Sequence, residues 1–175
     1  ATRPTTSGNN DTASAGVRVV RSYPTISVLS VPSTSLADAA QKVLYRMSIA
    51  APSGANGVSL YKFTFSVATT GDDGGAADVT ITNLRLYAFT GSNFSGGAFS
   101  ADAQLNNGPT FFSSEGGNDG VEANRGTTTD FAIYFNPAGP TSADPEAILV
   151  PAGATYYFEL RGDITGADTG DTATV

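Results

Sequence analysis

Few side chains in this sequence could carry out chemistry, and those that could are mainly carboxylates. The 175 residues include no His and no Cys, which excludes imidazole bases, thiol nucleophiles and the usual zinc sites. Of the glutamates, only Glu159 falls within a clear strand pattern, and its apolar neighbours Phe158 and Leu160 indicate that it points outward. A carboxylate pair for glycoside hydrolysis is therefore not indicated. We expect the protein not to be an enzyme.

Two groups of aspartates lie in glycine-rich turns and are the candidate metal ligands. The first group is Asp72, Asp73 and Asp78, and the second is Asp163, Asp168 and Asp171. Calcium needs several converging oxygen ligands, which such turns can offer, but neither spacing matches an EF-hand loop. Asp and Gly are also favoured in turns for local backbone reasons. Solvated turns are the simpler interpretation, calcium is the minor alternative, and no other cofactor is expected.

Sugars are the other candidate ligands or modifications. Asn10 and Asn93 each begin an N-glycosylation sequon in a predicted loop. Four phenylalanines lie among small polar residues, where they could stack on a sugar or fill the core beneath a long loop: Phe94, Phe99, Phe111 and Phe112. The sequence contains no Trp, which argues against a dedicated carbohydrate-binding face. Surface glycans are therefore possible partners of this protein.

Charge and composition narrow the partners and the location. The net charge is −7 with scattered basic residues, so nucleic acid is disfavoured as a partner. No apolar run approaches the ~18 residues of a membrane span, so no membrane insertion is expected. A chain that begins at Ala1 without Met fits a secreted product whose signal peptide has been removed, and fits a trimmed piece equally. We expect an extracellular or cell-surface location.

Alternating apolar residues predict strands along most of the chain. The clearest patterns cover residues 43–49, 60–67, 79–88, 131–135, 148–150 and 156–160. A change of parity between Ile81 and Leu84 predicts a bulge or a short break near Asn83. Residues 35–41 could form a helical turn, and residues 90–128 are expected to be loops with one or two short edge strands. The pattern predicts an all-β, antiparallel β-sandwich of about seven to nine strands in one domain, residues 32–175.

The segment from Val17 to Val31 is unusually long for one strand. Extended, its 15 residues would reach roughly 50 Å, more than twice an ordinary strand. It follows residues 1–16, which lack an apolar pattern and predict a flexible N-terminal arm. Either the segment bends at Pro24 and serves two sheets of its own domain, or it reaches a neighbouring molecule. The residues that would make such a contact are Val17, Val19, Val20, Tyr23, Pro24, Ile26, Val28 and Val31.

Three stretches resemble a known class of modules. They are VLYRMSIAAPSGANGVSLYKFTFSVATT, VTITNLRLYAF and ILVPAGATYYFELRGDITG. Together they are similar to immunoglobulin-like β-sandwich modules of bacterial cell-surface proteins, including S-layer-type and filament-forming ones. The resemblance covers about residues 17–164 and consists of core and turn patterns. It implies structural, adhesive or assembly roles, with no catalytic residues to transfer.

The chain departs from that class at its end, where TGADTGDTATV leaves little room for a full closing strand. A sandwich short of a strand exposes unpaired backbone groups, which an extended segment of a neighbour can fill by β-strand addition. Head-to-tail repetition of such an interface produces a filament. We therefore expect a self-assembling subunit of a surface filament, pilus-like fibre or surface layer. The alternatives are a monomeric adhesive or glycan-binding module of a larger surface protein and, third, a virion or phage structural protein.

Overall fold

The computed structural model describes residues 23–54, 56–70, 79–99, 102–106, 112–113, 128–135 and 146–175. Within these ranges the chain is all-β, with antiparallel pairing and no helix, which confirms the predicted fold class at that level. The strands in chain order are β1 (Thr25–Leu29), β2 (Ala39–Ala50), β3 (Val58–Leu60), β4 (Lys62–Thr70), β5 (Thr80–Phe89), β6 (Phe112–Ser113), β7 (Thr128–Tyr134), β8 (Ile148–Val150), β9 (Thr155–Thr165) and β10 (Thr172–Thr174).

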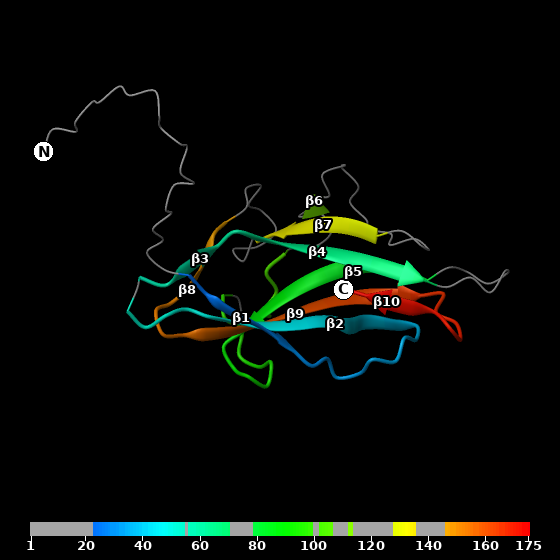
Figure 1. Cartoon of the computed structure of the whole chain (residues 1–175), viewed down its shortest axis with the longest axis horizontal. Helices are drawn as coiled ribbons and strands as arrows, with labels where there is room; N and C mark the ends of the chain where they lie inside the picture. Colours follow the sequence, from blue (N-terminus) through cyan, green and yellow to red (C-terminus); the bar gives the residue numbers. More distant parts are fainter. Residues whose placement is uncertain are drawn as a thin grey trace, which may run out of the picture.

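Two four-stranded sheets form the body of the molecule (Figure 1). The first sheet has the order β1-β2-β9-β5, and the second has the order β10-β4-β7-β6. A separate ribbon of β3 and β8 lies at one end of both sheets. The longer strands are rich in β-branched and aromatic residues, which favour this pairing because such side chains pack well on a pleated surface.

The two sheets bury their apolar faces against each other. Phe63 of β4 packs edge-on against Phe158 of β9, with ring centroids 5.2 Å apart, and Tyr45 of β2 packs against Phe65 of β4 at 6.0 Å. The core around these rings includes Ile49, Val67, Ile81, Leu86, Ile133, Phe135 and Leu160. Such edge-to-face contacts are favourable for aromatic rings. The arrangement is consistent with a β-sandwich.

Several details differ from the sequence prediction. The described residues hold ten strands, so the predicted count of seven to nine is not confirmed. The helical turn predicted over residues 35–41 is wrong, because 39–41 already belong to β2 and 35–38 lie outside any regular element. The strand predicted over residues 60–67 is interrupted at Tyr61, which separates β3 from β4 and is half exposed. Its aromatic stripe therefore begins at Phe63.

Other details agree with the prediction or refine it. The pairing of β5 with β9 shifts register between Thr82 and Arg85, and Asn83 has a φ of 49°, which confirms the irregularity predicted there. Near the C-terminus, three residues form β10 and pair with Ala68–Thr70 of β4. The short end of the chain thus supplies a closing strand, but only along the last part of β4.

Candidate functional site

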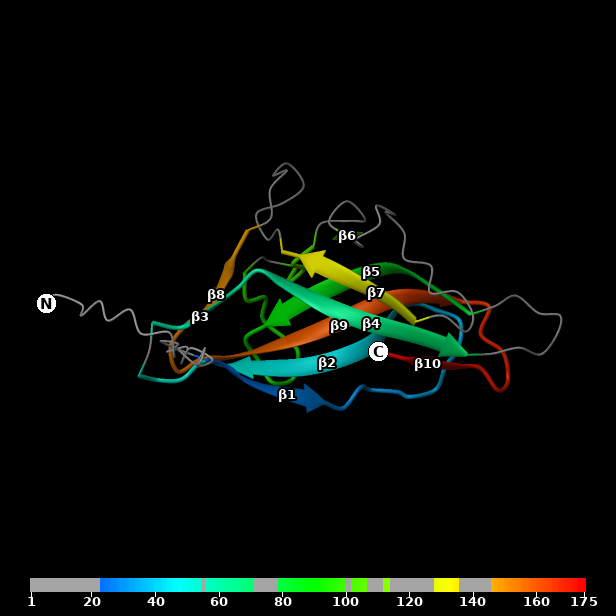
Figure 2. The same ribbon diagram turned by 45° about the horizontal axis from the view of Figure 1, so that its top comes forward.

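β1 is the outermost strand of the first sheet. It lies between Pro24 and Pro32, which cannot donate a ladder hydrogen bond and therefore tend to bound edge strands. It pairs along its whole length with β2 of the same chain, from Thr25 opposite Ala50 to Leu29 opposite Arg46. Among the described strands none pairs with its other edge, and Figure 2 shows β1 on the outside of the sheet.

Two apolar residues of β1 face the inside of the molecule without being covered. Residues directly opposite each other in an antiparallel pair have side chains on the same face. Ile26 lies opposite Ile49 and Val28 opposite Met47, and both partners are buried in the core. Ile26 is nevertheless 59% exposed and Val28 68% exposed. The second sheet therefore does not extend over β1. We call this uncovered inner surface the open side.

The opposite side of the first sheet, next to β5, is covered by the chain itself. Backbone hydrogen bonds join Ala88 N–H to Ala103 C=O at 2.8 Å and Leu105 N–H to Leu86 C=O at 2.8 Å. The fully buried side chain of Asn106 accepts from Leu86 N–H at 2.7 Å and donates to Leu84 C=O at 3.0 Å. Leu105 is fully buried in the core. We call residues 96–99 and 102–106, together with β5, the covered side.

The structure narrows the assembly residues predicted from the sequence. Val17, Val19 and Val20 lie outside the described residues. Tyr23 is exposed and Pro24 half-buried just before β1, Ile26 and Val28 form the open side, and Val31 follows β1 and lines a pocket. Because Thr25–Leu29 pairs with its own β2, a strand donated to a neighbour would have to come from the residues before Tyr23.

The predicted metal ligands do not gather in the described residues. Asp72, Asp73 and Asp78 lie outside that part of the chain. Asp163, Asp168 and Asp171 are described, and no group of three acidic side chains suited to a metal ion occurs there. Asp168 and Asp171 instead form a turn in which Asp168 N–H donates to the Asp171 carboxylate at 2.8 Å. This agrees with the interpretation of such aspartates as turn residues.

Asp163 connects two irregularities on either side of β9. Its carboxylate accepts from Gln41 N–H at 2.8 Å and from the Asn83 amide at 2.7 Å. Gln41 and Asn83 both have positive φ, and each lies at a register shift of its strand against β9. The hydrogen bonds from Asn83 and Gln41, with the charge of Arg85, hold the pKa of Asp163 below its usual 3.8 despite some burial. Asp163 thus stabilises the two strand irregularities at Gln41 and Asn83.

Glu159 is the buried ionic residue that the sequence did not reveal. It points away from the core, as predicted, yet it is only 1% exposed. One carboxylate oxygen lies 2.5 Å from the Arg46 guanidinium and the other 2.5 Å from that of Arg161. Phe94 stacks on Arg46 at 3.8 Å and Tyr87 on Arg161 at 4.3 Å, which shields the group from water. Arg46 and Tyr87 lie directly opposite Glu159 on the two strands that flank β9. The sequence could reveal this arrangement only if the register of the three strands were known.

The structure places some of the predicted loop phenylalanines and one of the two sequon asparagines. Phe94 packs on the outer face of the first sheet against Phe89 and Tyr157, and Phe99 packs against Tyr156 at the core. Phe111 and Asn10 lie outside the described residues, and Phe112 is part of β6. Asn93 is exposed in a turn and accepts a hydrogen bond from Ser95. The two described ring systems therefore serve packing, and the Asn93 side chain is accessible.

Comparison of the chain with family models, with curated proteins and with solved structures finds no match. Over the described residues, no helix has the length and apolar character needed to span a membrane. The contrast between the open and covered sides is therefore the basis for a functional proposal.

Proposed function

We propose that the protein is a structural subunit of an extracellular surface filament, pilus-like fibre or surface layer. It associates with itself, head to tail, by β-strand addition of its N-terminal segment to a neighbouring subunit. The observation that carries the proposal is the exposure of Ile26 and Val28 on the inner face of the first sheet.

This exposure has a physical cost that a neighbouring strand would remove. Burying a Val or Ile side chain is worth roughly 1.5–3 kcal/mol, so two such residues on a core-facing surface favour a cover. An edge strand next to an apolar surface is also a ready template for another chain. The covered side supports the same idea, because there residues 96–99 and 102–106 supply both the backbone partners and the apolar side chains.

An immunoglobulin-like form of the sandwich is part of this proposal. It rests on the likeness of the core and turn patterns to cell-surface modules, and the antiparallel pairings β2–β9 and β4–β7 in facing sheets support it. The extracellular location is also proposed, from that likeness.

The test uses two full-length variants that each disable one partner of the interface. Val17→Asp with Val19→Asp disables the donated segment, and Ile26→Asp with Val28→Asp disables the open side. Sedimentation velocity and negative-stain electron microscopy should find assemblies for the unchanged chain and monomers for both variants. Thr64→Asp, on an exposed residue of β4, is the matched control and should assemble normally.

Mixing the two variants makes the test specific. The variant with an intact segment and the variant with an intact open side should form a one-to-one heterodimer, although each alone is monomeric. Assembly that persists in either variant, or a mixture that stays monomeric, would contradict the proposal. Circular dichroism of each variant establishes that it is folded.

A further inference from the structure

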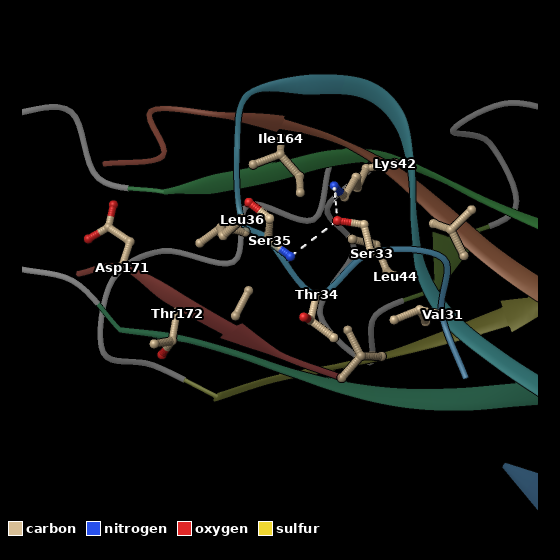
Figure 3. A pocket seen from close by; sticks show the side chains of 13 residues that line it. Val31, Ser33, Thr34, Ser35, Leu36, Lys42, Leu44, Ile164, Asp171 and Thr172 are labelled. Atoms are coloured by element: carbon tan, nitrogen blue, oxygen red, sulfur yellow. Dashed lines mark hydrogen bonds between the residues drawn. The ribbon is translucent and has the colours of Figure 1, made fainter. Parts of the chain in front are cut away.

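A pocket of about 250 Å³ opens where the chain leaves β1 (Figure 3). Residues 31–36 form one wall, the first part of β2 forms another, and β10 forms the third. The residues that matter here are the apolar Leu36, Leu44, Ile164 and Val175 and the charged Lys42 and Asp171. Lys42 Nζ lies 3.4 Å from Ser33 Oγ, and the Ser35 N–H donates to the same hydroxyl, so one wall is held by local hydrogen bonds. The pocket thus has an apolar interior and a polar rim.

The pocket and the open side lie at successive positions along β2, the neighbour of β1 in the first sheet. Ile26 lies opposite Ile49 and Val28 opposite Met47, while Leu44 of the pocket is further along β2 toward its start. At ~3.3 Å per residue, the distance from the level of Ile49 to Leu44 is about 17 Å. Figure 2 shows β10 running beside the segment that follows β1. The exposed inner face of β1 and the pocket thus follow one another along β2. We call the two together the groove, and at that spacing its length suits roughly five residues of extended chain.

Charge favours the chain's own N-terminal segment as the occupant of the groove. Residues 1–22 carry three arginines and one aspartate, a net charge of +2, whereas residues 23–175 carry six basic and fifteen acidic residues, a net charge of −9. Within the arm, Val17 and Val19 alternate with Arg18, the pattern of a strand with one apolar and one polar face. The arm of one copy and the body of another are thus complementary in both charge and apolar pattern.

We propose that the pocket receives Val17 of a second copy of this chain and that Val28 packs against Val19 of the same donated strand. The strand runs in the direction of β10, and Arg18 lies between the pocket and Val28, on the rim of a pocket whose acidic lining residue is Asp171. This inference rests on the function proposed above and adds the register and the direction of the strand. From Val17 to Tyr23 an extended chain spans about 20 Å, which exceeds the length of the groove. The body of the donating subunit therefore stays outside the groove.

The test measures the affinity of the one-to-one heterodimer described above. In the subunit that accepts the strand, Ala173→Leu fills the pocket from β10, and Thr174→Leu on the same strand is the control because Thr174 does not line the pocket. Ala173→Leu should weaken the heterodimer at least about tenfold, because a buried Val side chain is worth more than that in affinity. Thr174→Leu should change the affinity less than about twofold.

Charge reversal tests whether Arg18 lies close to the charged rim of the pocket. Arg18→Glu in the donor, or Asp171→Arg in the acceptor, should each weaken the heterodimer by about threefold at low salt. The two changes together should restore the affinity, and ~0.5 M NaCl should abolish the difference. If the heterodimer forms but neither the pocket nor the charge variants affect it, this inference is wrong while the proposed function stands. If no heterodimer forms even between the starting variants, the proposed function itself is wrong.

Discussion

The two sides of the first sheet differ in how their apolar surface is covered. On the covered side, residues 96–99 and 102–106 lie along β5, bond to its backbone and bury Leu105 in the core. On the open side, β1 ends the sheet and Ile26 and Val28 face inward with more than half of their surface exposed. The described residues of the chain thus cover the apolar surface at β5 but not the apolar surface at β1. This difference is the reason for our proposal that a neighbouring subunit covers the open side.

Under the proposed function, the stability of the subunit and its association depend on different residues. Groups that hold the sheet together are found on the covered side and in the middle of the sheet, around Asn106, Glu159 and Asp163. The open side contributes little to the core of the single subunit. Substitutions at Asn106, Glu159 or Asp163 should therefore lower mainly the free energy of unfolding. Substitutions on the open side should weaken mainly the association of subunits.

The largest effect on stability is expected at the middle of the sheet. Glu159→Ala would leave Arg46 and Arg161 next to each other without their shared carboxylate. Removing one partner of a buried ion pair costs about 3 kcal/mol, so urea denaturation should show a loss of that size. Asp130→Ala, which removes an exposed carboxylate bonded to Ser66, should cost less than about 0.5 kcal/mol. Equal effects of the two variants would contradict the role given to Glu159.

The next largest effect is expected on the covered side. Asn106→Ala removes the acceptor of Leu86 N–H and the donor to Leu84 C=O, and both backbone groups stay buried. An unsatisfied buried polar group costs about 1–3 kcal/mol, so for these two groups we expect a loss of at least about 2 kcal/mol in the free energy of unfolding. Ser27→Ala, on β1, should be neutral within about 0.5 kcal/mol. A comparable loss at Ser27 would remove the contrast between the two sides.

A smaller and pH-dependent effect is expected at Asp163. Because its pKa is lowered in the folded state, its contribution is fully present above the ordinary value of 3.8 and is lost as pH falls through the lower folded pKa. Asp163→Asn should therefore lower the melting temperature at pH 7, consistent with a loss of about 1 kcal/mol. The difference from the unchanged protein should shrink below pH 3.8. A difference that is constant from pH 7 to about pH 2 would show that the charge has no role.

The smallest effect on stability is expected on the open side. Ile26→Thr with Val28→Thr keeps the β-branched shape of exposed strand residues, so the free energy of unfolding of the monomer should change by less than about 0.5 kcal/mol. Association should nevertheless weaken strongly in sedimentation experiments. A large loss of stability with unchanged association would reverse the assignment of the two sides.

The sequence predicted the class of fold but only part of the candidate site. Alternation made β2, β4, β5 and β9 visible, and the parity change at Ile81 and Leu84 located the bulge. It could not reveal the covered side, because residues 102–106 bond to β5 largely through backbone groups that any sequence carries. Nor could it reveal the burial of Glu159, which depends on the register of three strands. The sequence predicted the whole segment from Val17 to Val31 as a possible donated strand, and only the pairing of β1 with β2 separates Thr25–Leu29 from the residues before Tyr23.

The most direct test of the central claim is an intermolecular disulfide across the proposed interface, which a chain with no cysteine allows without background. A chain with Val19→Cys is mixed with a chain with Val28→Cys under mild oxidation, and Ser27→Cys on the opposite face of β1 replaces Val28→Cys as the control. Disulfides form only when Cβ atoms come within about 4.5 Å, so we expect Val19→Cys to cross-link rapidly to Val28→Cys and not to the control. No cross-link between positions 19 and 28, or equal products for both faces of β1, would contradict it.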